Sequence, residues 1–322
     1  MSSRSGGGGK GRRGSGGGQS TGGAKNSGGG RRSGSGGGRR SGGGPAGGAG
    51  AKGSRKRSSQ GGGGSRRGSG APRKRPGGLD GTQVEGRQAV RELLLAGRRR
   101  VREVYVGNDV ERADVVEDIV SLAAELKVPV REVSRSKIDH LSSTDAPQGV
   151  VAFADQIPGD ELSALCSGDT GRPFLLALDG VTDPGNLGAL LRIAECAGVT
   201  GVVIPRHRAA RVTPTVAKAA VGAAEYLPMA LVGGLPAAME EMRAAGIWVV
   251  GLDAGGDTSI HDLELGAESV CLVLGAEGPG LSRLVRERCD LVASIPLLGQ
   301  LASLNVASAG AVACYEVARR RS

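Results

Sequence analysis

Residues 1–78 of this 322-residue chain lack acidic and aromatic side chains altogether and contain almost no apolar ones. The same residues hold 33 of the 59 glycines and 18 of the 42 Lys and Arg side chains. A segment of this composition buries too little apolar surface to offset the entropy lost on ordering. We therefore expect residues 1–79 to form a disordered, basic tail rich in Gly, Ser and Arg.

The positive charge of the chain belongs to this tail. The whole sequence has a formal net charge of +10, whereas residues 79–322 contain 24 basic and 32 acidic residues, a net charge of −8. Clusters such as Arg12-Arg13 and Arg73-Lys74-Arg75 favour contact with a nucleic acid over a purely solubilising role. Because the tail has no Phe or Tyr on which bases could stack, we expect this contact to lack sequence specificity.

Cysteine pairs and long apolar runs are also missing. The five cysteines are scattered without a C-x-x-C pair, so neither a disulfide framework nor a zinc site is indicated, and no metal is expected. There is no apolar signal segment at the N-terminus, and no stretch approaches the roughly 18 continuous apolar residues of a membrane span. These absences favour a cytoplasmic protein that has no membrane partner.

The first folded part is expected to be a small α/β unit over residues 80–155, followed by a linker over 156–172. The helical spacing of Val90, Leu93 and Leu94 predicts a helix over 83–95. The pattern that follows predicts strands at 101–106, 128–133 and 149–154, and helices at 113–126, 136–141 and 161–165.

A larger α/β alternation is expected over residues 173–322. Apolar runs predict buried strands at 174–178, 201–204, 227–230, 247–252, 270–274 and 291–295. Helical patterns separate most of them, at 187–197, 215–224, 235–245, 281–287 and 303–319. This order predicts a largely parallel sheet with helices on both faces.

The first polar segment, D-G-V-T-D-P-G-N-L-G at 179–188, follows a predicted strand and opens a helix. Asn186 is a good helix N-cap. Arg192 lies in an otherwise apolar helix, and Gly188, one turn earlier, leaves space beside its guanidinium. An ion pair with Glu195 would explain Arg192 equally well, so this segment alone leaves the role of Arg192 open.

The second polar segment is G-A-E-G-P-G at 275–280. Its glycine order differs from the G-x-G-x-x-G of dinucleotide-binding folds, which disfavours phosphate binding. The glycines allow close approach of another group to the backbone. Glu277 is then either a cap of the next helix or a carboxylate directed into a pocket.

The third segment, I-P-L-L-G-Q-L-A-S-L-N-V-A-S at 295–308, is largely apolar although no regular structure is predicted for most of it. Loops are usually polar, so we expect this segment to lie inside the protein, where its backbone needs hydrogen-bonding partners. A bound ligand is one candidate partner. Ser303 and Asn305 could alternatively serve only as helix caps.

The fourth segment is a basic cluster, Arg206, Arg208 and Arg211 with Lys218 beyond, after a predicted strand. Open α/β sheets bind ligands at the carboxyl ends of their strands. Because the folded part is acidic, we favour contact with RNA phosphates over a solvated loop.

Taken in order, three motifs resemble those of the SpoU (TrmH-like) branch of the SPOUT RNA 2′-O-ribose methyltransferases. They are D-P-G-N-L-G-A-L-L-R at 183–192, L-G-A-E-G-P-G-L at 274–281 and I-P-L-L-G-Q-L-A-S-L-N-V at 295–306. Residues 82–153 resemble the small L30e-like RNA-binding domain of the ribosomal-RNA guanosine methyltransferases in this branch. The best match is to members that modify a guanosine in the peptidyl-transferase region of 23S rRNA.

The resemblance implies a fold and a cofactor. The fold is an α/β domain whose C-terminal segments form a deep trefoil knot, and the cofactor is S-adenosylmethionine. The adenosine would be held by backbone groups near Gly275, Ile295 and Leu304. The glycine motif of nucleotide-fold methyltransferases is absent, which agrees with the knotted class. A homodimer packed through the knot region and the last helix is also implied.

The functional side chains implied by the resemblance are Asn186, Arg192, Glu277, Ser303 and Asn305. The motifs contain no His or Cys that could act as a base. Arg192 either accepts the proton of the ribose 2′-hydroxyl or positions the hydroxyl and phosphate, and positioning is favoured because a guanidinium stays protonated near neutral pH and has no lone pair to accept a proton. Asn186, Ser303 and Asn305 would orient Arg192 and the ribose, and Glu277 would support the pocket.

Three functions remain in competition at this point. A 23S rRNA guanosine methyltransferase comes first, and a tRNA ribose 2′-O-methyltransferase is disfavoured by the small preceding domain. A non-catalytic RNA-binding or ribosome-assembly protein is disfavoured by the intact set of five functional side chains.

One departure from the family pattern is Ala307, where many members have Ser.

Overall fold

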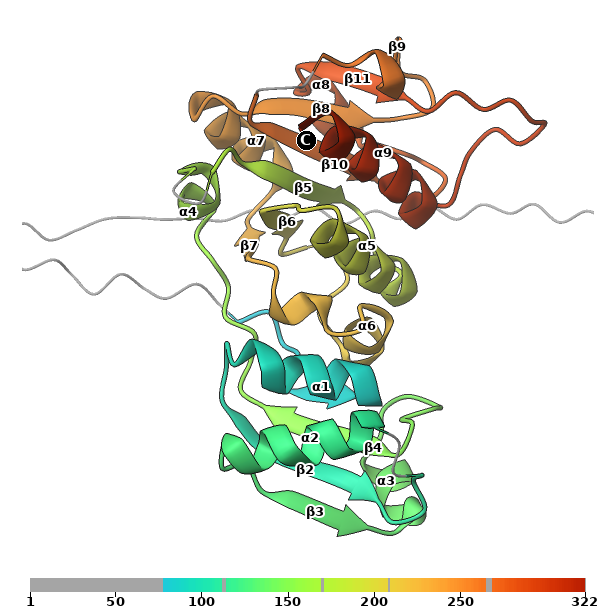
Figure 1. The fold of residues 1–322 in the computed structure, drawn as a ribbon. Coiled ribbons are helices and arrows are strands. Elements are labelled where there is room, and N and C mark those ends of the chain that lie inside the picture. Colours follow the sequence, from blue (N-terminus) through green and yellow to red (C-terminus); the bar gives the residue numbers. More distant parts are fainter. Residues whose placement is uncertain (1–77, 112–113, 169–170, 208, 265–267, 322) are drawn as a thin grey trace, which may run out of the picture. The chain divides into compact units, whose positions relative to one another are not determined.

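The computed structural model describes residues 78–111, 114–168, 171–207, 209–264 and 268–321. Apart from its last two residues, the expected basic tail lies outside the described residues. The described chain forms two sheets, one built from strands within 83–154 and one from strands within 174–294 (Figure 1).

The smaller sheet has the strand order β1-β4-β2-β3. Strand β4 runs antiparallel to its neighbours β1 and β2, and β2 runs parallel to β3. The strands are β1 (Gln83–Glu85), β2 (Val101–Gly107), β3 (Val130–Val133) and β4 (Val150–Ala154). The helices are α1 (Arg87–Ala96), α2 (Asp114–Glu125) and α3 (Arg135–Leu141).

The predicted helix over 83–95 is wrong at its start. Gln83–Glu85 is a strand, paired antiparallel with β4, and the helix begins only at Arg87. Gly86 separates the two elements with a φ of 98°, which favours glycine. The buried carboxylate of Glu85 accepts hydrogen bonds from the backbone N–H of Ser143 at 2.6 Å and from Thr144. Tertiary pairing therefore overrides the helical pattern here.

The larger sheet has the order β7-β6-β5-β10-β8-β11-β9, and every pair of neighbouring strands in it is parallel. This confirms the predicted parallel sheet. The strands are β5 (Phe174–Asp179), β6 (Gly201–Pro205), β7 (Met229–Val232), β8 (Trp248–Leu252), β9 (Thr258–Ser259), β10 (Val270–Gly275) and β11 (Leu291–Ser294). The two-residue strand β9 was not predicted.

Helices cover both faces of this sheet, as predicted. Along β5, Leu176 and Leu178 pack in one core cluster with α5, α6 and α9, while Leu175 and Ala177 pack in another with α4, α7 and α8. This alternation follows from the two-residue period of a strand. The helices are α4 (Leu162–Cys166), α5 (Pro184–Cys196), α6 (Pro214–Ala219), α7 (Leu235–Ala244), α8 (Arg283–Glu287) and α9 (Val306–Arg321).

Helix boundaries also differ from the prediction. The helix expected over 215–224 stops at Ala219, and Val221 and Gly222 have φ values of 53° and 87° before the 3-10 turn η1 (Ala223–Glu225). The last helix starts at Val306 rather than at residue 303. Among the described residues, no helix has both the length and the apolar character that a bilayer span requires.

The small residues of α9 allow close packing against α5 within the same chain. A Cβ atom added to Gly310 would lie 2.4 Å from Cδ2 of Leu190, so a larger residue at this crossing would have to displace the Leu190 side chain. The buried positions of α9 include Ala307, Ala313 and Cys314. The close packing that these small residues allow is therefore accounted for inside the chain.

A buried ion pair joins the segment between α1 and β2 to the turn η1. The guanidinium of Arg99 donates to both carboxylate oxygens of Glu225, at 2.8 and 2.5 Å, and both side chains are only 3% exposed. Arg99 also donates to the carbonyl oxygens of Gly81 and Asp155. All the charges at this joint thus have partners within the chain.

Candidate active site

A pocket of about 370 Å³ lies at the carboxyl ends of β8, β10 and β11 and at the start of α9. This volume is in the range that small-molecule sites occupy. Ligand pockets are expected at this edge of an open parallel sheet. Its lining comes from the second and third motifs and from the end of β8: Leu252–Ala254, Leu274–Gly280, Ile295, Leu297, Ser303–Val306 and Ala309.

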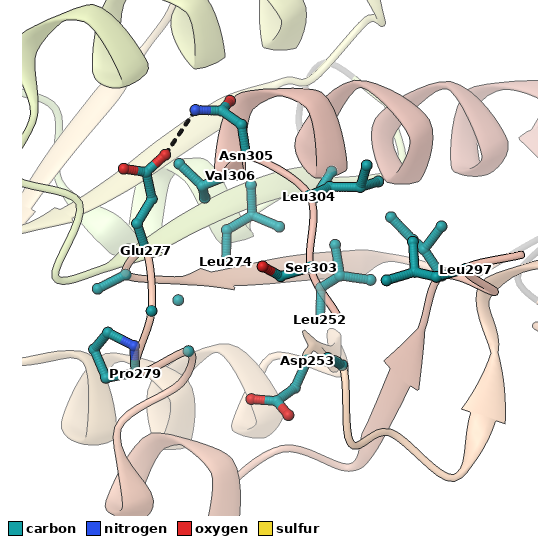
Figure 2. A pocket seen from close by; sticks show the side chains of 17 residues that line it. Leu252, Asp253, Leu274, Glu277, Pro279, Leu297, Ser303, Leu304, Asn305 and Val306 are labelled. Atoms are coloured by element: carbon teal, nitrogen blue, oxygen red, sulfur yellow. Dashed lines mark hydrogen bonds between the residues drawn. The ribbon is translucent and has the colours of Figure 1, made fainter. Parts of the chain in front are cut away.

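Asn305 connects the three motifs. Its Nδ2 donates a hydrogen bond of 2.9 Å to Oδ1 of Asn186. It donates another of 2.6 Å to Oε1 of Glu277 (Figure 2). Residues 186, 277 and 305 are far apart in sequence and meet because the carboxyl ends of parallel strands share one edge of the sheet. One amide therefore fixes the side chains of the other two motifs.

Asn305 also caps the last helix. Its Oδ1 accepts hydrogen bonds from the backbone N–H groups of Ala307 at 2.9 Å and Ser308 at 3.2 Å. The two alternatives considered for Asn305, a helix cap and a site residue, are thus compatible. Ser303 lies before the helix and lines the pocket.

Asn186 does not cap its own helix. Asp183 is the N-cap of α5, and its Oδ1 accepts a hydrogen bond of 2.7 Å from the backbone N–H of Asn186. This corrects the expectation from the sequence, which named Asn186 as the cap. Because Asp183 occupies the cap, the side chain of Asn186 is available to Asn305.

The glycine-rich turn holds Glu277 at the pocket. Ala276 and Gly280 exchange two backbone hydrogen bonds of 3.0 Å, and a Cβ atom on Gly275 would lie 2.2 Å from the carbonyl carbon of Gly280. The N-cap position of α8 is occupied by Ser282, so Glu277 is not a helix cap. Its carboxylate points toward Asn305 instead (Figure 2).

Asp253 is a pocket residue that the sequence analysis missed. It directly follows β8 and lines the pocket. Its Oδ1 accepts a hydrogen bond from the backbone N–H of Gly255 and forms an ion pair with the Arg286 guanidinium. Partial burial alone would raise the pKa of this carboxyl, but the N–H groups of Gly255 and Leu281 and the Arg286 guanidinium together lower its pKa. Its position after a buried strand was the available signal.

The segment at 296–305 is not buried, contrary to expectation. Its residues are exposed, with Leu298 at 100% and Leu301 at 81% exposure. The chain leaves β11, extends beyond the sheet and returns to α9 (Figure 1). Ile295, Leu297 and Leu304 do line the pocket. The apolar character of this segment therefore reflects a pocket wall and an uncovered surface rather than burial.

Arg192 lies outside the set of residues that line the pocket. Arg192 is exposed, and its guanidinium makes no hydrogen bond or ion pair among the described residues. The ion pair with Glu195 that the sequence allowed is therefore not formed. Six residues along a helix rotate the side chain by about 120° from Asn186. Gly188 packs against Ala219 of α6, so it does not leave space beside Arg192.

The predicted basic cluster is divided. Arg206 is exposed, Arg211 pairs with Asp80 at 3.3 Å, and the Lys218 ammonium donates to the carbonyl oxygen of Ala146 at 2.6 Å. Arg208 lies outside the described residues. None of the three described residues lines the pocket, and their contact with RNA stays a prediction.

The charges around the pocket indicate what kind of ligand fits. Its lining contains two carboxylates, Asp253 and Glu277, and no Lys, Arg or His among the described residues. Such a lining repels phosphate groups and favours a ligand that carries positive charge. Leu252, Leu274 and Val306 add apolar surface suited to a flat aromatic group.

These features define an α/β protein that binds a small cofactor at the edge of a parallel sheet. The model of the SpoU rRNA methylase family matches residues 173–315, and the model of the substrate-binding domain of RNA 2′-O-ribose methyltransferases matches residues 83–158. The chain belongs to the SpoU rRNA methylase family.

Similar proteins cover most of the folded chain. The 23S rRNA (guanosine-2′-O-)-methyltransferase RlmB of Pseudomonas aeruginosa is 40% identical over 244 residues, which are 74% of this chain and 97% of that protein. An uncharacterized tRNA/rRNA methyltransferase of Mycobacterium ulcerans is 40% identical over 78% of this chain and 82% of its own length.

A solved structure shares the fold. The SpoU methyltransferase AviRb of Streptomyces viridochromogenes, in complex with the cofactor AdoMet, aligns with a TM-score of 0.63 and 28% identity. The alignment covers 74% of this chain and 89% of AviRb.

Proposed function

We propose that this protein transfers a methyl group from S-adenosylmethionine to a ribose 2′-hydroxyl of RNA, and that its substrate is a guanosine of 23S rRNA. The observation that carries the proposal is the Asn305 amide, which joins Asn186 and Glu277 beside the pocket. The 40% identity to a 23S rRNA guanosine methyltransferase, over nearly its full length, supports the substrate.

The pocket residues fit this cofactor. The apolar side chains of Leu252, Leu274 and Val306 suit the adenine, and backbone groups near Gly275, Ile295 and Leu304 would hold the adenosine. Glu277 is a carboxylate without a basic partner among the described residues, so it suits a cationic sulfonium or ammonium group. When bound, the cofactor supplies an electrophilic methyl carbon.

The side chains of this chain then prepare the acceptor. A ribose 2′-hydroxyl becomes a good nucleophile only as its proton is drawn away. The unpartnered guanidinium of Arg192 is available to bind the ribose and the adjacent phosphate, and it stabilises negative charge on the attacking oxygen. Asn305 keeps Glu277 in place through its hydrogen bond of 2.6 Å.

The protein acts as a cytoplasmic homodimer in this proposal. Its support is the exposed apolar surface of the segment 296–305 and of α9, where Leu298, Leu301, Val312 and Tyr315 are uncovered in one chain. Burial of apolar surface is the main favourable term in such associations. The trefoil knot implied by the motifs belongs to the same proposal.

The decisive experiment separates methyl transfer from cofactor binding. Replacing Arg192 by alanine should lower methylation of 23S rRNA at least about a thousandfold, because charge on the attacking oxygen is no longer stabilised, while S-adenosylmethionine binding in calorimetry changes little. Arg283→Ala, on the exposed surface of α8, is the matched control. Undiminished methylation by Arg192→Ala would contradict the assignment. Mapping 2′-O-methyl sites in rRNA and tRNA with and without the gene tests the substrate.

A further inference from the structure

The two carboxylates of the pocket are in different electrostatic states. Asp253 is paired with the Arg286 guanidinium at 2.8 Å between Nη1 and Oδ1. Glu277 receives a hydrogen bond from the neutral amide of Asn305 and has no ion pair among the described residues. A compensated carboxylate attracts a cation weakly but still accepts hydrogen bonds from neutral donors.

The two oxygens of Asp253 also differ. Oδ1 accepts from Gly255 N at 2.9 Å and from Arg286, and the same Arg286 donates to the carbonyl oxygen of Gly255 at 2.7 Å. Oδ2 receives only a long contact of 3.4 Å from the backbone N–H of Leu281. The carboxylate is therefore held rigidly through one oxygen while the other keeps acceptor capacity.

Gly280 lies close to Oδ2 of Asp253, where a side chain would crowd this oxygen. A Cβ atom on Gly280 would lie 2.7 Å from Oδ2 of Asp253, and the φ of 68° at Gly280 disfavours other residues in any case. Both residues line the pocket, and Figure 2 shows the Asp253 carboxylate there. A fixed acceptor with one open oxygen beside an apolar cleft is suited to the hydroxyl groups of a sugar.

We propose that Oδ2 of Asp253 accepts hydrogen bonds from the ribose hydroxyls of the cofactor's adenosine, so that Asp253 selects a ribose-bearing cofactor. This inference rests on the proposed function. It divides the recognition of the cofactor between two acids. Glu277 faces the cationic part of the ligand, and Asp253, whose charge Arg286 compensates, faces the neutral sugar.

Calorimetry with S-adenosylhomocysteine and its 2′-deoxy and 3′-deoxy analogues tests the proposal. The neutral thioether removes the sulfonium charge from the comparison. In the unmodified protein, removing a hydroxyl bound to Asp253 should weaken binding about tenfold or more, as expected for a hydrogen bond to a charged group. In Asp253→Ala, the ribose ligand and the affected deoxy analogue should bind equally, within about twofold, as in a double-mutant cycle.

Matched variants keep the result interpretable. Asp257→Ala removes an exposed acid of the same loop that does not line the pocket, and it should discriminate as the unmodified protein does. Thermal unfolding checks that each variant is folded. If Asp253→Ala is unfolded, Asp253→Asn keeps the volume of the side chain and should lose part of the discrimination.

Three outcomes would overturn the inference. Full discrimination of ribose from deoxyribose in the folded Asp253 variants would do so, as would no discrimination in the unmodified protein. A loss of S-adenosylmethionine binding much larger than the loss of S-adenosylhomocysteine binding would assign Asp253 to the cation instead. Failure of the unmodified protein to bind either ligand would contradict the proposed function itself, which separates the two failures.

Discussion

The joint formed by Arg99 and Glu225 and the rim of the pocket differ in whether their polar and apolar groups have partners within the chain. At the joint, Arg99 and Glu225 are each 3% exposed, and each group on them has a partner in the chain. The rim consists of Glu277 and the segment 296–305; there Leu298 is fully exposed, and Glu277 has no ion pair among the described residues. The joint is complete within one chain, whereas the rim is suited to further molecules.

The difference indicates where stability and function are located. A buried ion pair is costly to disturb, because removal of one partner leaves an uncompensated charge in a low-dielectric environment. An uncovered apolar residue or an unpaired charge on the surface contributes little to folding and is available for binding. Substitutions at the joint should therefore change the free energy of unfolding, and substitutions at the rim should change association and catalysis.

The largest effect on stability is expected from Glu225→Ala. The variant leaves the Arg99 guanidinium buried without its carboxylate, which should reduce the free energy of unfolding by about 3–5 kcal/mol. Denaturant unfolding followed by circular dichroism measures the change. Arg102→Gln is the control, because it removes an exposed pair with Asp155 and should cost less than about 1 kcal/mol. Equal losses of unfolding free energy in the two variants would contradict the difference expected between a buried and an exposed ion pair.

A change in association, with little effect on folding, is expected from the double variant Leu298→Asp and Leu301→Asp. Fully burying one leucine contributes about 1.5–3 kcal/mol, so the dimer dissociation constant should rise about a hundredfold or more. Sedimentation equilibrium measures it, while the unfolding of the single chain should change little. Leu284→Asp on α8 is the control, since that leucine is also exposed but lies outside the rim. A monomeric unmodified protein would remove the basis for the proposed dimer.

The parallel sheet could be predicted from the sequence because its strands are buried on both faces and appear as short apolar runs. The meeting of Asn186, Glu277 and Asn305 could be expected for the same reason, since parallel strands present their carboxyl ends at one edge. The three-residue strand at Gln83–Glu85 could not, because its pairing with β4 is a long-range contact that local periodicity does not contain.

The pocket shows a second limit of sequence analysis. Asp253 acquires its environment from Arg286, 33 positions later, and nothing in either local sequence indicates that pair. The apolar segment at 296–305 has the composition of a buried loop, but composition cannot distinguish burial inside a chain from a surface that binds another molecule.

The smallest effect is expected at Glu316 on α9, where charges are paired as at the joint but nearer to solvent. Hydrogen bonds from Arg319 and then Arg320 lower the pKa of Glu316 to about 2, and Nδ1 of the His261 imidazole lies 3.8 Å from Oε2 of Glu316. The carboxylate therefore adds stability above the usual glutamate pKa of about 4.3, and this contribution is lost as the pH falls toward 2. Glu316→Gln should lower the free energy of unfolding by less than about 1 kcal/mol at pH 6. Urea unfolding at a series of pH values from 6 down to 3 measures this loss, which should shrink as the pH falls. A difference that stays constant over this range would mean that packing, and not charge, accounts for it. A cost as large as that of Glu225→Ala would show that burial is not what separates the two pairs.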